Sequence, residues 1–79
     1  MSEHDTLYFD GSCPLCRREM GHLARLKSER LILQDIHDLR ESDDIPDKAD
    51  LLQSLHLRKN DHWVTGLEAN IAAWQYTRI

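Results

Sequence analysis

The sequence has few of the residues that hold small proteins together by covalent bonds or rigid turns. Its 79 residues include two cysteines, three glycines and two prolines, and 6% are aromatic. A domain of this length buries only about 60% of the surface that its unfolded chain exposes, so its stability is marginal. A disulfide between Cys13 and Cys16 would close too short a loop to add much stability. The close spacing of the two cysteines therefore needs a chemical explanation.

The chain also has no excess of basic residues and no long apolar run. Ten lysines and arginines stand against fourteen aspartates and glutamates, which gives a formal net charge of -4. Proteins that bind nucleic acid need basic side chains against the phosphates, so we expect no nucleic-acid partner. No stretch reaches the roughly 18 apolar residues of a membrane span, and residues 1–5 lack the basic start of a signal peptide. We therefore expect a cytoplasmic protein, in a compartment where thiols stay reduced.

The first half of the chain has the pattern of a strand, a helix and a second strand. Residues 6–9 form a short β-branched and aromatic run that ends in a turn over residues 10–12, which is typical of a buried strand. Pro14 suits the first position of a helix, and apolar residues at helical spacing predict a helix over residues 14–28. The apolar run within residues 30–36 is typical of a strand covered on both faces. The two strands are expected to be parallel, with the helix on one face of the sheet.

The second half continues with a short helix and a hairpin. The acidic residues within 38–47 predict a surface connection, and the leucines within 51–55 predict a short second helix. Residues 56–59 and 62–65 are typical of two antiparallel strands. Asn-Asp at residues 60–61 lies between them and predicts the hairpin turn.

A third helix follows the hairpin. Thr65 and Glu68 match a capping box, in which each side chain bonds to the backbone at the start of the helix. The expected apolar stripe of this helix consists of Leu67, Ile71 and Trp74. The element order is therefore βαβαββα. We predict an α/β fold with a four-stranded mixed sheet and helices on both faces, which is the arrangement of a thioredoxin-like core.

The most informative motif is Cys13-Pro14-Leu15-Cys16, placed where the first strand passes through a glycine turn into a helix. Cys13 would lie at the N-cap, where free backbone N–H groups and the helix dipole favour a thiolate. Cysteines in such positions have pKa values well below that of free cysteine, so we predict Cys13 to be the attacking thiol. Cys16 lies one turn later on the apolar face, and is expected to keep a higher pKa and to resolve a mixed disulfide.

Three charged residues flank this motif. Arg17 and Arg18 could add positive potential near Cys13, or they could be ordinary solvated surface. Asp10 could accept and return a proton during exchange, or it could cap the turn that follows it. The sequence leaves both pairs of alternatives open.

The chain resembles a known family at the same motif. Residues 8–19, Tyr-Phe-Asp-Gly-Ser-Cys-Pro-Leu-Cys-Arg-Arg-Glu, look like the opening of the DCC-family thiol-disulfide oxidoreductases, named for their Asp, Cys, Cys signature. Residues 55–69 are similar to the hairpin and following helix of that family. The resemblance covers most of the chain. It implies a thioredoxin-like fold and thiol-disulfide exchange, with Asp10, Cys13 and Cys16 as signature positions. Our first hypothesis is a thiol-disulfide oxidoreductase that needs no bound cofactor and acts on a disulfide-containing protein or a small thiol.

The sequence departs from the family pattern in two places. Members usually continue for some tens of residues further, so we expect residues 1–79 to be a single thioredoxin-like domain truncated at its C-terminus. Thioredoxins also carry a cis-proline before the third strand, near the place of Ser54 and Leu55 here, whereas the two prolines of this chain are Pro14 and Pro46. Without that proline the site lacks the usual backbone edge for docking a substrate and the usual barrier to metal capture.

A metal site is the alternative use of the cysteine pair. The pair has half of the spacing of a tetrahedral zinc site, and the chain has five histidines. His56 and His62 fall at the edge of a ligand spacing, and His22 lies two turns along the first helix from the cysteines. Neither His22 nor His37 pairs with a neighbour at ligand spacing, and most of the histidines are expected to be surface residues. The second hypothesis is therefore a non-catalytic redox-sensing or metal-binding module on the same fold.

Overall fold

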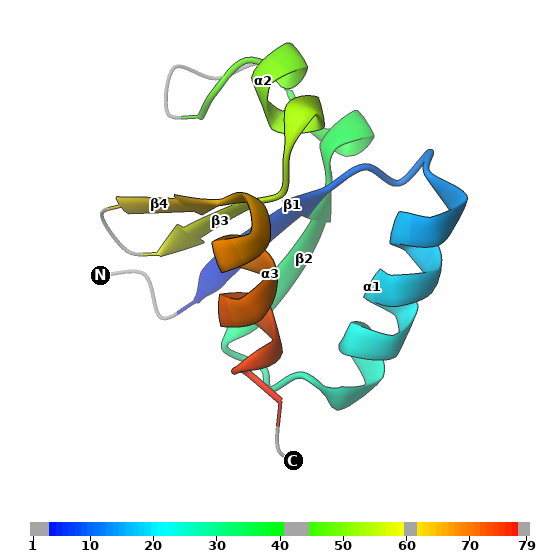
Figure 1. Cartoon of the computed structure of the whole chain (residues 1–79), viewed down its shortest axis with the longest axis vertical. Coiled ribbons are helices and arrows are strands. Elements are labelled where there is room, and N and C mark those ends of the chain that lie inside the picture. Colours follow the sequence, from blue (N-terminus) through cyan, green and yellow to red (C-terminus); the bar gives the residue numbers. More distant parts are fainter. Residues whose placement is uncertain (1–3, 41–44, 60–61, 78–79) are drawn as a thin grey trace.

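The helices and strands follow one another in the predicted order, with one addition. The computed structural model describes residues 4–40, 45–59 and 62–77. The elements are β1 (Asp5–Phe9), α1 (Pro14–Leu26), β2 (Leu31–Asp35), the 3-10 helix η1 (Ile36–Asp38), α2 (Lys48–Gln53), β3 (His56–Lys59), β4 (His62–Thr65) and α3 (Gly66–Trp74) (Figure 1). The short η1 is the element that the sequence pattern did not predict.

The four strands form one mixed sheet in the order β2-β1-β3-β4. Strands β1 and β2 are parallel over five residue pairs, from Asp5 opposite Leu31 to Phe9 opposite Asp35. Strand β3 is antiparallel to both β1 and β4. The fold is therefore the predicted α/β, thioredoxin-like arrangement. The predicted hairpin turn at residues 60–61 lies outside the described residues.

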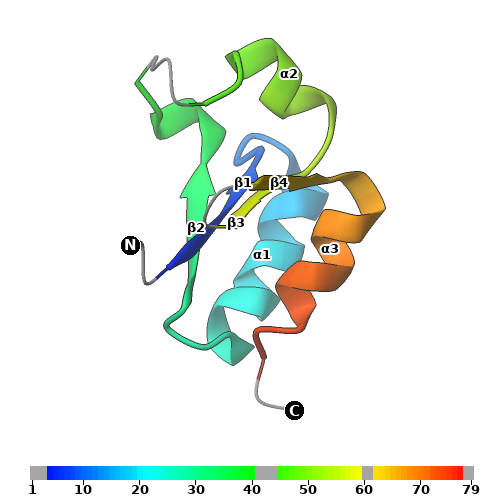
Figure 2. The same cartoon turned by 90° about the vertical axis from the view of Figure 1, so that its left-hand side faces the viewer.

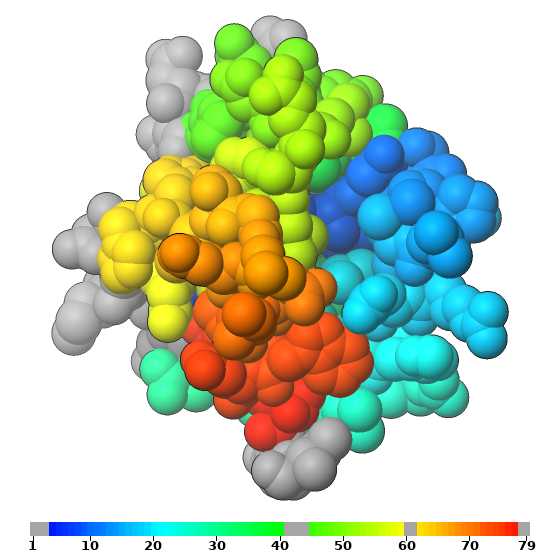
Figure 3. Space-filling model, in the orientation of Figure 1, coloured from blue at the N-terminus to red at the C-terminus, as the bar shows by residue number. Residues whose placement is uncertain are grey.

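Helices cover the two faces of the sheet unequally. Helices α1 and α3 lie on one side of the sheet, and α2 lies beyond one end of the strands (Figure 2). Neighbouring residues of β1 point to opposite faces, since Leu7 belongs to the core beneath α1 and α3 whereas Tyr8 packs with Ile36 and Leu51 of η1 and α2. The larger core also holds buried residues of both long helices, so the surfaces of α1 and α3 lie side by side in the space-filling view (Figure 3).

Strand β2 is an edge strand with one open face, and the expectation that both of its faces are covered was wrong. Leu31 is fully buried, whereas Ile32, which points to the other face, is 42% exposed. The cause is the short reach of η1 and α2, which cover the sheet at one end only (Figure 2). A run of apolar residues cannot distinguish such a strand from one buried on both faces.

Helix α3 packs mainly through its small residues, so the predicted apolar stripe was wrong for Leu67 and Ile71, although its third member, Trp74, packs against the larger core. Ala69 and Ala73 are 0% and 1% exposed, whereas Leu67 and Ile71 are 76% and 54% exposed. Small side chains allow the helix backbone to approach the sheet closely, and the larger ones are left outside. The predicted capping box was also wrong, because Thr65 is the N-cap but its side chain makes no cap hydrogen bond.

The end of the described chain is tied to the start of β1. The Tyr76 hydroxyl donates a hydrogen bond to the Asp5 carboxylate, and the Ser28 N–H donates to the Tyr76 carbonyl at 2.8 Å. Burial and the Asp5 contact raise the pKa of Tyr76 to about 12. Trp74 and Tyr76 both pack against the larger core. Among the described residues no helix is long and apolar enough to cross a membrane.

Candidate active site

Cys13 occupies the N-cap of α1, as the motif predicts. Its backbone is extended, and Pro14 is the first residue of the helix. The Cys13 Sγ accepts a hydrogen bond from the Cys16 backbone N–H at 3.3 Å, and the Cys13 carbonyl accepts the N–H of Arg17 at 2.9 Å. The sulfur therefore serves as the capping acceptor for a backbone donor that the helix itself leaves unpaired.

The two thiols differ in acidity. The pKa of Cys13 is lowered, first by a hydrogen bond from the Cys16 thiol and then by the backbone N–H groups of Cys16 and Leu15, against burial and the negative charge of Asp10. The pKa of Cys16 is raised to about 11, first because its thiol donates to Cys13 and then because of burial and nearby negative charges. Both cysteines are free and partly exposed. Cys13 is thus the thiol that carries a thiolate most readily.

Asp10 shapes the turn that leads to Cys13. Its Oδ1 accepts hydrogen bonds from the Ser12 N–H at 2.9 Å and the Ser12 hydroxyl at 2.6 Å. Its carbonyl accepts the N–H of Cys13 at 3.2 Å. These side-chain bonds, with one from His37, lower the pKa of Asp10 to about 2. The capping role that the sequence left open for Asp10 is therefore present.

His37 is a site residue that the sequence did not predict, and Asp35 is a second. The Nε2 of His37 lies 2.7 Å from Oδ1 of Asp10, across 27 residues of chain. The contact arises because β1 and β2 are parallel and in register, so that Phe9 lies opposite Asp35 and the residues after the two strands meet at one edge of the sheet. The sequence predicted the parallel pair but not its register, and only the register brings this imidazole to Asp10.

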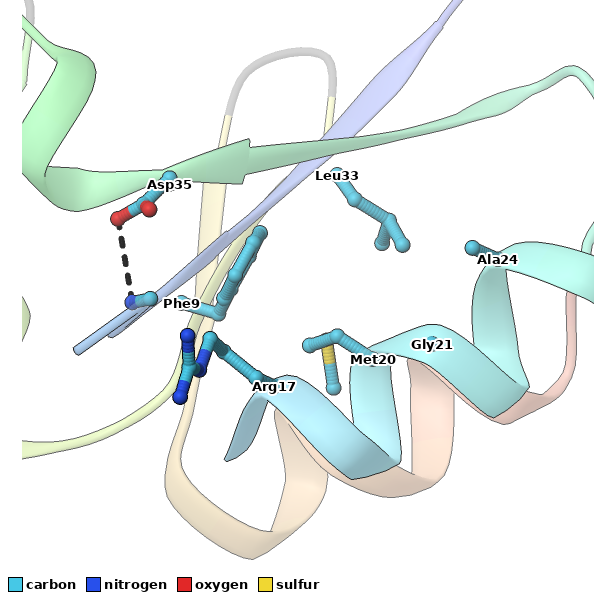
Figure 4. Close-up of a pocket in the computed structure, with 8 residues that line it drawn as sticks. Phe9, Arg17, Met20, Gly21, Ala24, Leu33 and Asp35 are labelled. Carbon is cyan, nitrogen blue, oxygen red and sulfur yellow. Dashed lines mark hydrogen bonds between the residues drawn. The ribbon is translucent and has the colours of Figure 1, made fainter. Parts of the chain in front are cut away.

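Asp35, the last residue of β2, forms hydrogen bonds both to the turn at Gly11 and to His37. Its Oδ1 accepts the N–H of Gly11 at 3.1 Å, drawn as the dashed line in Figure 4, and the N–H of His37 at 3.0 Å. A Cβ at Gly11 would overlap the Asp35 carboxylate, so this position requires glycine for close approach. Two carboxylates thus stabilise the turn before Cys13: Asp10, which belongs to the turn, and Asp35, at the end of β2.

A shallow groove of about 380 Å³ runs beside α1 (Figure 4). Its side-chain lining consists mainly of Phe9, Met20, Ala24, Leu33, Arg17 and Asp35. Arg17, Gly21 and Ala24 recur at helical spacing on α1, so the groove follows one face of this helix. Arg17 and its neighbour Arg18 are both exposed.

The remaining predicted residues lie away from the pair or take structural positions. His22 is exposed on α1, whereas His56 is 8% exposed with its Nδ1 2.8 Å from the Ser54 carbonyl. The ring of His56 also lies edge-on to Trp63, with ring centroids 6.0 Å apart. Among the described residues there is no group of three or more histidines, cysteines, aspartates or glutamates that could hold a metal ion.

The place of the thioredoxin cis-proline has a different construction. No described peptide bond is cis. The Leu55 carbonyl accepts the N–H of Gly66 at 2.8 Å, and Gly66 has a φ of +65°, a conformation that favours glycine. A backbone hydrogen bond therefore joins the residue before β3 to the start of α3, near the place where thioredoxins have a proline.

A Cys-x-x-Cys pair at the start of the first helix of this sheet topology defines the class of thioredoxin-like proteins. Within that class, the model of the DCC1-like thiol-disulfide oxidoreductase family matches residues 7–79, and the chain belongs to this family. The resemblance seen in the sequence is thereby confirmed. Comparison with curated proteins and with solved structures gives no match.

Proposed function

We propose that the protein exchanges disulfides through two unequal cysteines. The Cys13 thiolate attacks one sulfur of a substrate disulfide, RSSR, and releases one thiolate RS⁻. Cys16 then attacks Cys13 of the mixed disulfide, forms the Cys13–Cys16 bond and releases the second substrate sulfur. Two electrons pass from the cysteine pair to the substrate, and the Cys16 proton ends on a released thiol.

The observation that carries this proposal is the opposite displacement of the two pKa values. Hydrogen bonds to the Cys13 sulfur lower its pKa, whereas that of Cys16 rises to about 11. A thiolate is the nucleophile in exchange, and a thiol of high pKa stays protonated until it is needed. The geometry therefore supports Cys13 as the nucleophile and Cys16 as the resolving thiol.

Asp10 enters the proposal as the residue that forms the turn before Cys13. A carboxylate with a pKa of about 2 is a weak acceptor for a proton from a thiol with a pKa of about 11. Of the two roles considered for Asp10, the hydrogen bonds to Ser12 favour the turn. The exposed Arg17 and Arg18 would add a modest positive potential, which salt screens.

The substrate in this proposal is a disulfide of a protein or a small thiol, and the reaction needs no bound cofactor. The natural partner that reduces or oxidises the pair, and the cytoplasmic setting, stay predictions from the sequence. The alternative, a module that holds a metal through both sulfurs, predicts zinc at one ion per chain in the purified protein and thiols that do not exchange. Metal content by mass spectrometry separates the two hypotheses.

Two serine variants test the proposed roles. Cys13→Ser removes the nucleophile and should abolish reduction of a disulfide substrate. Cys16→Ser keeps the nucleophile, and should accumulate a mixed disulfide between Cys13 and the substrate that non-reducing mass spectrometry identifies. If both variants formed a mixed disulfide at equal rates, the assignment of the two thiols would be wrong.

A further inference from the structure

We propose that His37 is a positioning residue for the cysteine pair, which holds the Asp10 turn in the conformation that stabilises the Cys13 thiolate. This inference rests on the proposed exchange reaction. It adds a residue that lies outside the Cys-x-x-Cys motif and reaches the motif through Asp10, from the far end of a neighbouring strand.

The hydrogen bonds at Asp10 fix the role of the imidazole. Three donors converge on Asp10 Oδ1, namely the N–H and hydroxyl of Ser12 and Nε2 of His37. A carboxylate that is ionised at neutral pH can only accept hydrogen bonds. Nε2 of His37 therefore carries the proton and donates it to Asp10, whatever the state of Nδ1.

Asp35 holds the backbone of His37 in place. The Asp35 Oδ1 accepts the N–H of His37 and the N–H of Gly11, on either side of the contact between the two segments. The end of β2 and the turn after β1 are thus joined by two carboxylates and one imidazole. His37 and Asp10 have side chains that are 35% and 32% exposed, so the ring is held by these bonds without being buried.

His37 affects the Cys13 thiolate in two ways: it offsets the negative charge of Asp10, and it holds the turn that Asp10 forms. The negative charge of Asp10 raises the pKa of both cysteines, and a donor that takes up part of this charge weakens that effect. Besides Asp10, the ionisable side chains next to His37 along the chain are Asp35, at the end of β2, and Asp38, within η1. Loss of the His37 donor should therefore disfavour the thiolate and the reduced pair.

The test compares three variants through their equilibrium with glutathione at pH 7. His37→Leu removes the donor, His37→Gln keeps an N–H at the end of the side chain, and His22→Leu is the matched control for losing an exposed histidine. We expect His37→Leu to shift the equilibrium constant toward the disulfide by about three- to tenfold, or about 15–30 mV for two electrons. His37→Gln should recover most of the shift, and His22→Leu should match the original protein.

Two results would overturn the proposal. One is an equilibrium constant for His37→Leu within twofold of the original protein. The other is a loss of thermal stability in His37→Leu without any shift in that constant, which would make the contact merely structural. If the original protein itself does not exchange with glutathione or any test disulfide, the proposed function fails; if it exchanges and His37→Leu behaves like it, only the role of His37 fails.

A measurement on the unaltered protein gives an independent check. Nitrogen-15 NMR of the imidazole distinguishes the two neutral tautomers. We expect the neutral ring of His37 to carry its proton on Nε2, and Asp10→Asn to remove that preference. A neutral His37 with its proton on Nδ1 would contradict the hydrogen bond on which the proposal depends.

Discussion

At the scale of single residues, two glycines differ in the space available for a side chain. Gly11 lies against the Asp35 carboxylate, whereas Gly21, in the middle of α1, has open space where a side chain would begin. The same substitution should therefore have opposite effects at the two positions. The sequence places Gly11 in a turn and Gly21 in a helix, but the close contact between Gly11 and Asp35 follows only from the fold.

Gly11→Ala should destabilise the protein by about 1–3 kcal/mol, because the new methyl group displaces Asp35 and breaks its bond to the turn. Gly21→Ala should stabilise it by up to about 1 kcal/mol, because alanine is the better helix former. Urea unfolding of both variants measures the difference. Equal stability changes would show that Gly11 and Asp35 are not in close contact.

At the scale of elements, helix α3 shows how far a periodic pattern can mislead. Its apolar residues recur at helical spacing on more than one face, and the sequence pattern favours the larger ones, Leu67 and Ile71. The sheet instead receives Ala69 and Ala73, which are almost fully buried. Periodicity predicted that a helix lies here, but the distance between helix and sheet decides which face is buried.

Ala73→Leu should cost about 1–3 kcal/mol of stability, because there is no room for the larger side chain between α3 and the sheet. Ile71→Lys on the outer face should change stability by less than about 0.5 kcal/mol. Thermal unfolding followed by circular dichroism compares the two. The reverse order would mean that α3 packs through the stripe that the sequence pattern predicted.

At the scale of the whole molecule, the sequence predicted the sequential parts of the site and missed those that depend on register. The strand, the glycine turn, the helix and the N-cap cysteine are consecutive, so their local patterns suffice. The contact between His37 and Asp10 spans 27 residues and exists only because β1 and β2 pair in one register. The open face of β2 was missed for a similar reason, since it depends on how far η1 and α2 extend over the sheet.

The unequal acidity of the cysteines is likewise a property of the assembled molecule. The donors to Cys13 come from the first turn of α1, and the opposing charge comes from the turn that β2 helps to hold. None of these contacts exists in an unfolded chain, where both thiols should titrate near the value of free cysteine, about 8.5. Denatured protein therefore serves as the internal reference for the folded one.

The most direct test is the rate of alkylation by iodoacetamide as a function of pH, with mass spectrometry assigning the label to each cysteine. In the folded protein, Cys13 should react with a midpoint below that of the denatured chain, and Cys16 should react only as the pH approaches about 11. In denaturant the two midpoints should coincide. Coincident midpoints in the folded protein, or faster labelling of Cys16 at neutral pH, would contradict the account.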